Sequence, residues 1–161
     1  MPPLNLIRDL LFYNEKTGVF FWRVTRGVRK KGAVAGTIDP KGYVSITISK
    51  KRYRAHRLAW YYFYGSEPDL DIDHINRKPS DNRISNLRLA TKFQNHHNQG
   101  VSKNNKTGFK GVHFSQREGK YLSQITINHK RISLGYHNTA EEANQAYLKA
   151  AELYQGKFSL K

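Results

Sequence analysis

The chain has 161 residues, of which 28 are Lys or Arg and 12 are Asp or Glu, giving a formal net charge of +16. It contains no cysteine, which excludes a disulfide framework and a thiolate zinc site. The longest apolar run, 58–64, is too short for a membrane span, and the N-terminus lacks the pattern of a signal peptide, so we expect an intracellular protein without a membrane partner.

The positive charge is spread along the chain. Residues 1–99 carry 18 basic and 8 acidic side chains, and residues 100–161 carry 10 and 4. Such a balance is typical of a chain that binds nucleic acid. A structural RNA-binding protein would show the same balance, so charge alone does not choose the function.

The first elements are predicted from periodicity. A short helix is expected over 4–12, followed by strands over 19–23, 43–48 and 52–55, which Gly-containing turns and a Lys pair separate. A helix over 56–64 should end at Gly65 and carry the aromatic residues Trp60, Tyr61, Phe63 and Tyr64. We expect this stripe to pack in the core, with base stacking as the lesser alternative. His56 at its start is expected to be structural.

Residues 71–98 predict the order strand, loop, strand, helix. Apolar and polar residues alternate over 71–75 and again over 87–90, and a polar stretch with Pro and Asn separates them. Thr91 is a good N-cap for a helix that extends to about Asn98 and carries Asn95 in its second turn.

Four side chains in this segment predict phosphodiester hydrolysis. The imidazole of His74 titrates near neutrality and suits a general base that takes a proton from water. The oxygens of Asp73 and Asn95 suit Mg²⁺ or Mn²⁺, which would neutralise the scissile phosphate. Asn86, twelve residues after His74, is expected to bond the backbone near that histidine across the strand pair. Loop asparagines with a surface histidine are the plain alternative.

These positions, together with the strings Asp81-Asn82-Arg83 and Asn86-Leu87-Arg88, resemble the HNH family of nucleases in its phage homing-endonuclease branch. The resemblance implies a ββα-metal (His-Me finger) domain. In it, Asp73 and Asn95 would be metal ligands, His74 the general base and Asn86 a positioning residue. Arg83 and Arg88 are expected to contact DNA.

A linker is expected over 100–107, and residues 108–161 predict a second domain. Strands are expected over 109–114, 121–128 and 130–134, with a tight turn at 128–129, and Thr139 should cap a helix whose small residues lie close on the sheet. This part resembles the ethylene-response-factor type (apetala-like) of DNA-binding domain, in the strings Gly111-Val112, Leu134-Gly135 and 139–143. The resemblance implies that the sheet contacts DNA through Lys110, His113, Ser115, Arg117, Gln124, Thr126 and Arg131. A protein-interaction module is the alternative for this part.

The whole prediction is an α+β chain. An HNH nuclease domain over 1–99 is followed by a three-stranded antiparallel sheet packed on one helix. The expected function is a metal-dependent endonuclease acting on double-stranded DNA, a homing endonuclease in the cytoplasm of a phage-infected bacterium, as a monomer or a homodimer. A non-catalytic DNA-binding regulator and an RNA-associated structural protein are the alternatives from other classes.

Overall fold

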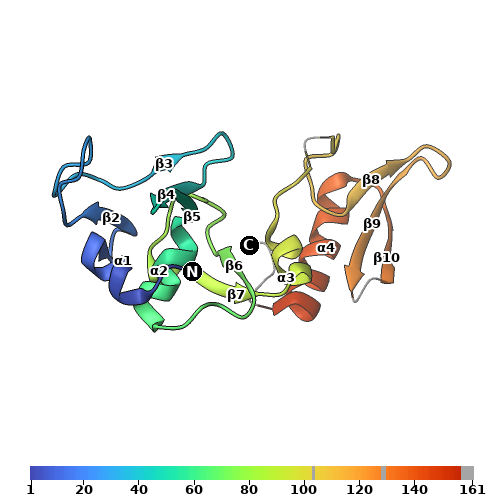
Figure 1. Cartoon of the computed structure of the whole chain (residues 1–161). Helices are drawn as coiled ribbons and strands as arrows, with labels where there is room; N and C mark the ends of the chain where they lie inside the picture. The colour runs from blue at the N-terminus through green and yellow to red at the C-terminus, as the bar shows by residue number, and fades with distance from the viewer. Residues whose placement is uncertain (103, 128–129, 157–161) are drawn as a thin grey trace. The chain divides into compact units, whose positions relative to one another are not determined.

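The computed structural model describes residues 1–102, 104–127 and 130–156, apart from the side chains of residues 96, 97 and 155. The chain is mixed α+β, as predicted, and divides into two compact units, Met1–Thr91 and Lys92–Lys161 (Figure 1). This division falls after Thr91, whereas the sequence placed the first boundary after residue 99, so the helix that follows Thr91 groups with the second unit.

The first unit opens with helix α1 (Leu4–Leu10) and the hairpin of β1 (Leu11–Asn14) and β2 (Val19–Trp22). The predicted helix over 4–12 was therefore too long, and strand β1 was not predicted. The strand begins where burial starts to alternate: Leu11 and Tyr13 are buried while Phe12 is exposed. The aromatic residues of β2 pair across from β1, and such cross-strand pairs outweigh the helical propensity of a leucine pair.

A three-stranded sheet follows, in the order β3 (Thr37–Ile38), β4 (Val44–Ile48) and β5 (Lys51–Arg54). The predicted strands over 43–48 and 52–55 are confirmed to within a residue or so, whereas the two-residue β3 was missed. Helix α2 (Ala55–Tyr64) comes next and ends as predicted at Gly65, whose φ of 77° is the left-handed conformation that glycine adopts without strain.

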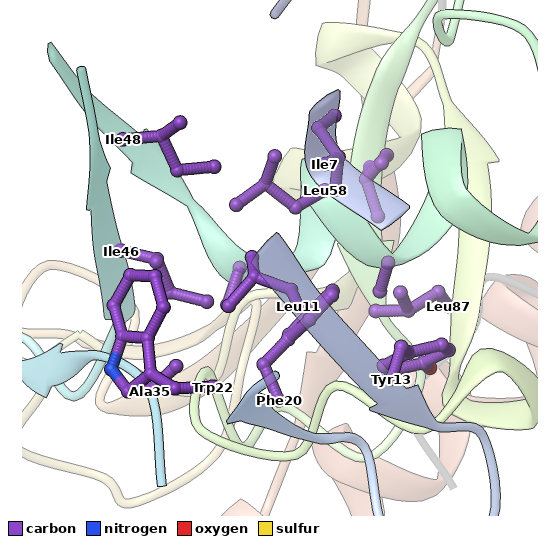
Figure 2. Packing of buried hydrophobic residues seen from close by; sticks show 13 residues of the cluster. Ile7, Leu11, Tyr13, Phe20, Trp22, Ala35, Ile46, Ile48, Leu58 and Leu87 are labelled. Carbon is purple, nitrogen blue, oxygen red and sulfur yellow. The ribbon is translucent and has the colours of Figure 1, made fainter. Parts of the chain in front are cut away.

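The core of the first unit lies between α1, α2 and the strands (Figure 2). Its most deeply buried large side chains are Ile7, Leu11, Phe20, Ile46, Ile48 and Leu58. The aromatic stripe of α2 was predicted to pack there as a whole. That prediction is wrong for Phe63 and Tyr64, which are exposed, and right for Trp60 and Tyr61, which pack partly buried against the core. The core contacts only one face of α2, whereas these four aromatic residues lie on more than one face of the helix.

The last part of the first unit is the pair of β6 (Asp71–His74) and β7 (Leu87–Ala90), which run antiparallel. A 3₁₀ turn, η1 (Ile84–Asn86), leads into β7. Helix α3 (Lys92–Asn98) then begins the second unit. The predicted order of strand, loop, strand and helix is confirmed.

The second unit contains an antiparallel sheet of order β10-β9-β8, formed by β8 (Val112–Ser115), β9 (Lys120–Ile127) and β10 (Lys130–His137). Helix α4 (Ala140–Gln155) packs on it through Tyr147, Ala150 and Ala151, which cluster with Ile125. Three strands and one helix were predicted. β10 continues beyond the predicted end at 134 because an irregularity between Ser133 and Gly135 lets the pairing resume. The turn predicted at 128–129 lies outside the described residues.

Thr139 caps α4 as predicted. Its hydroxyl accepts a hydrogen bond from the backbone of Glu142, whose carboxylate bonds the backbone of Thr139 in return. None of the helices within the described ranges combines the length and apolarity needed to cross a membrane.

Candidate active site

Asp73 and His74 are the last two residues of β6. His74 pairs with Leu87 and Asp73 pairs with Arg88, so the register of the two strands decides which side chains meet. Both polar residues are buried, with relative exposures of 5% and 6%. Burial of two adjacent titratable side chains is uncommon for a plain surface loop and marks this strand end as a candidate site.

Asn86 fastens the loop that leaves β6. Its Oδ1 accepts the backbone N–H of Asn76 at 3.0 Å, while its Nδ2 donates to the side-chain oxygen of Asn76 at 3.0 Å and to the carbonyl of Asp81 at 2.8 Å. Its own carbonyl accepts from Ile75 N at 2.9 Å. The predicted bond from Asn86 to backbone near His74 is confirmed. Its part in catalysis stays a prediction.

Asn82 is a site residue that the sequence reasoning did not assign. Its side chain is 1% exposed, and its Oδ1 lies 3.2 Å from Nε2 of His74. The Nδ2 of the same amide donates to the carbonyl of Ser80 at 3.1 Å, which fixes the orientation of the amide. The oxygen therefore faces the imidazole and accepts a hydrogen bond from Nε2–H, so that the lone pair of the neutral ring is on Nδ1.

The position of Asn82 is fixed from two further sides. Its backbone carbonyl accepts a hydrogen bond of 2.7 Å from the hydroxyl of Tyr13, which lies on β1, 69 residues earlier in the chain. Gly18, with φ of 73°, lies so close to the peptide between Asn82 and Arg83 that a Cβ there would overlap backbone atoms. In the sequence, Asn82 stands out only as part of the Asp-Asn-Arg string, which does not predict these contacts.

Two more rings pack against His74. The ring of His56, at the start of α2, lies edge-on at 5.1 Å between centroids, and the ring of Tyr43 lies at 6.1 Å from His74 and 5.7 Å from His56. His56 is buried, and its Nδ1 has no hydrogen-bond partner among the described residues. Burial, followed by the nearby His74 and Arg57, lowers the pKa of His56 to about 3, so the ring is neutral. The sequence did not place His56 against His74, and the structural role expected for His56 stays a prediction.

Burial also lowers the pKa of His74 below its usual 6.5. The bond with Asn82 and the carboxylates of Asp73 and Asp81 act in the opposite direction, and burial outweighs them. A neutral imidazole can take a proton, whereas an imidazolium cannot. This environment therefore keeps His74 in the form that a general base needs at neutral pH.

Asp73 forms an ion pair within the strand pair. Arg88 donates to its Oδ2 from Nε at 2.8 Å, and Nη2 of the same arginine lies 2.7 Å from that oxygen. Arg88, predicted to contact DNA, thus contacts a predicted metal ligand. Arg83, also predicted to contact DNA, pairs with both carboxylate oxygens of Asp81, and this bond is the main cause that lowers the pKa of Asp81 to about 2. The two DNA contacts stay predictions.

The donor atoms of the site fit a hard divalent cation in kind. The buried carboxylate of Asp73 and an asparagine amide are oxygen ligands of the type that Mg²⁺ and Mn²⁺ accept. Across the described part of the chain, His, Cys, Asp and Glu form no group of three or more that could hold a metal. Asn95, the second predicted ligand, lies on α3 in the second unit.

Five of the seven residues predicted to contact DNA in the second unit share one side of its sheet. Ile125 of β9 packs against α4, so its neighbours Gln124 and Thr126 point away from the helix. On β10, Arg131 pairs with Thr126 and therefore lies on the same side of the sheet. On β8, His113 pairs with Leu122, which lies two residues before Gln124 and so faces the same side, and His113 therefore shares that side too. Ser115 follows two residues after His113 and shares that side. Arg117 lies in the β8–β9 turn beside Glu118, and Lys110 precedes β8 and bonds the carbonyl of Gln99.

Part of the chain is similar to proteins described as HNH endonucleases. Residues 53–97 match the HNH endonuclease family. The chain is 29% identical over 110 residues to Protein 3.8 of Escherichia phage T7, across 68% of this chain and 90% of that protein. It is 34% identical over 91 residues to an uncharacterized HNH endonuclease of Acanthamoeba polyphaga mimivirus, across 56% of this chain and 46% of that protein, which is less than half of its length.

A solved structure described as DNA binding and cleavage by the HNH homing endonuclease I-HmuI aligns at 20% identity and a TM-score of 0.43, covering 91% of this chain and 84% of that one. The family match is more local. It spans α2, β6, β7 and most of α3, and it includes His56, Asp73, His74 and Asn86. Over residues 53–97 the chain is therefore similar to the HNH endonuclease family.

Proposed function

We propose that this chain is a metal-dependent DNA endonuclease that hydrolyses phosphodiester bonds with His74 as general base. One observation carries the proposal: within the HNH family segment, His74 is buried, its pKa is lowered, and its Nε2 faces the oxygen of Asn82. Nδ1 is then the atom that takes the proton from the attacking water. Asn86 keeps the loop after His74 in place.

Asp73 would be a ligand of a Mg²⁺ or Mn²⁺ ion, which when bound supplies positive charge that neutralises the scissile phosphate. Asn95, the other predicted ligand, belongs to the second unit, and its part stays a prediction. The ion pair with Arg88 fixes the orientation of the Asp73 carboxylate. The rings of His56 and Tyr43 cover sides of the His74 imidazole and limit its exposure to water. Exclusion of water is what keeps the pKa of His74 low.

The side of the second sheet that faces away from α4 is proposed to bind duplex DNA through His113, Gln124, Thr126 and Arg131, together with Ser115, Arg117 and Lys110. Arg83 and Arg88 are proposed to contact DNA from the first unit. The likeness to the phage T7 protein supports a phage setting. Action as a homing endonuclease in the cytoplasm of the infected bacterium, as a monomer or homodimer, completes the proposal.

The test is cleavage of supercoiled plasmid by the purified protein with Mg²⁺, with a chelator as control. His74→Ala should reduce the cleavage rate about 10²- to 10⁴-fold, the usual effect of losing a general base, while DNA affinity stays within a few-fold. Ile75→Ala is the matched control, because Ile75 is the next residue and its side chain is exposed. Cleavage by His74→Ala at the parent rate would contradict the assignment.

A non-catalytic DNA-binding regulator is the second candidate. One observation favours it: Asp73, the proposed ligand, is already paired with Arg88, which reduces the negative charge available to a cation. The same plasmid assay separates the two candidates. A regulator would bind duplex DNA tightly and leave the plasmid uncut at every Mg²⁺ or Mn²⁺ concentration.

A further inference from the structure

The segment between β2 and β3 is strongly basic. From Lys16 to Ile38 the chain has no acidic residue, and five cations fall within residues 23–31. They are Arg23, Arg26, Arg29, Lys30 and Lys31. We call residues 23–36 the basic ribbon. None of these residues belongs to the HNH family segment or to the residues predicted to contact DNA.

The basic ribbon is ordered by backbone hydrogen bonds. At its base, Trp22 N donates to Ala33 O at 2.9 Å, and Gly32 N donates to Trp22 O at 2.7 Å. At its tip, Arg26 and Arg29 exchange backbone bonds of 2.9 and 3.2 Å around the turn between them. Trp22 is part of the core, so the base is fixed to the body of the first unit. Figure 1 shows this segment as a narrow loop that leaves β2 and returns to β3.

The tip of the ribbon is open to solvent. Val28 is 98% exposed, and the cations are exposed apart from Arg29, which is partly buried. The guanidinium of Arg29 lies 4.4 Å from the ring centre of Trp22, so this side chain is held in place. The ribbon therefore presents its positive charge on an ordered support, which reduces the entropy lost when a ligand binds.

The charge of the ribbon is not balanced within the chain. Among the described residues, none of its five cations forms an ion pair with a carboxylate. Other arginines of the first unit do pair, for example Arg54 with Asp39 and Arg88 with Asp73. Five neighbouring unpaired cations repel one another, and a polyanion relieves this repulsion.

We propose that the basic ribbon binds the phosphate backbone of duplex DNA as a second contact surface of the first unit. A ribbon of two antiparallel chain segments fits the major groove, which is about 12 Å wide and admits such elements. Arginine and lysine on both sides of the ribbon then reach phosphates and release condensed counterions. This inference rests on the proposed function only in that both concern the same DNA. Binding by the ribbon requires no catalysis.

The test measures binding without cleavage. A fluorescent DNA duplex is titrated with full-length protein in chelator, at several salt concentrations from about 50 to 200 mM, the range over which phosphate contacts weaken strongly. The variant is Arg26→Gln with Lys30→Gln, which leaves Arg29 on Trp22. The control is Lys16→Gln with Lys149→Gln, which removes the same charge from exposed positions outside the ribbon.

If both ribbon cations contact phosphates, the slope of log affinity against log salt should fall by about 1.8, roughly 0.9 for each, and affinity should fall about 10- to 100-fold. The control pair should leave the slope unchanged. An unchanged slope for the ribbon variant would overturn the proposal, and so would an equal fall in the control, since net charge alone would then explain it.

Two further outcomes are distinguished. Vesicles of phosphatidylcholine and phosphatidylserine serve as a second polyanion. A variant that loses vesicle binding while keeping DNA affinity would overturn the proposal in favour of a membrane surface. A parent protein that binds DNA through the ribbon but never cuts plasmid would refute the proposed nuclease and leave the ribbon proposal standing.

Discussion

Replacing Asn82 with alanine tests the link between structure and chemistry most directly. In the parent, the amide oxygen accepts from Nε2 of His74, and the ring is buried. Without the Asn82 amide, an imidazole that carries its proton on Nε2 has a buried hydrogen-bond donor with no acceptor, which costs about 1–3 kcal/mol. The ring can escape this cost by carrying its proton on Nδ1, the atom proposed to act as base. At 1.36 kcal/mol for each factor of ten, kcat should fall about 10- to 100-fold.

The assay is single-turnover cleavage of plasmid at saturating protein, with urea denaturation measured on the same sample. Tyr13→Phe is the matched control, because it removes the hydroxyl that bonds the carbonyl of Asn82 and leaves the amide that faces His74. It should cost about 1 kcal/mol of stability and keep kcat near the parent value. An Asn82→Ala rate within twofold of the parent would refute the reasoning. Equal rate losses in both variants would show that loosening of the segment, rather than the imidazole contact, sets the rate.

The remaining predictions concern pH, metal, packing and DNA. Because burial lowers the pKa of His74, the neutral base persists below pH 6.5, and the acid limb of the profile of kcat against pH should lie below that value; a limb above it would contradict the burial argument. Asp73→Asn should lower kcat and raise the Mg²⁺ concentration needed for half-maximal cleavage, as measured by metal titration, and an unchanged titration would remove Asp73 from the ligand set. Gly18→Ala should destabilise the first unit by about 2–5 kcal/mol, since an alanine in the left-handed conformation costs about 1–2 kcal/mol and overlap with packed backbone atoms about 1–3 kcal/mol. Urea denaturation measures this loss. A variant as stable as the parent would show that the backbone there can shift. Arg131→Gln should reduce the log-log salt slope of DNA binding by about 0.9 if the second sheet contacts a phosphate at that position, and an identical slope would favour a protein-interaction role for the sheet.

Local pattern was enough to predict most elements and the central site residues. The alternation over 71–75 and 87–90 gave β6 and β7, and the adjacency of Asp73 and His74 put both on one strand end. The capping residue Thr139 and the small residues after it gave α4. β1 was missed because its leucine and aromatic residues suit either a helix end or a strand, and only the pairing with β2 decides between them.

The sequence by itself determined the positions at which polar side chains interrupt strand and helix patterns, and those positions include His74, Asp73 and Asn86. Only the tertiary structure decided what surrounds them. The contacts of His74 with Asn82 and with His56, and the ion pair of Asp73 with Arg88, depend on loop closure, on the packing of α2 and on strand register. Those choices are made by burial and hydrogen bonding between residues distant in sequence, and no local periodicity encodes them.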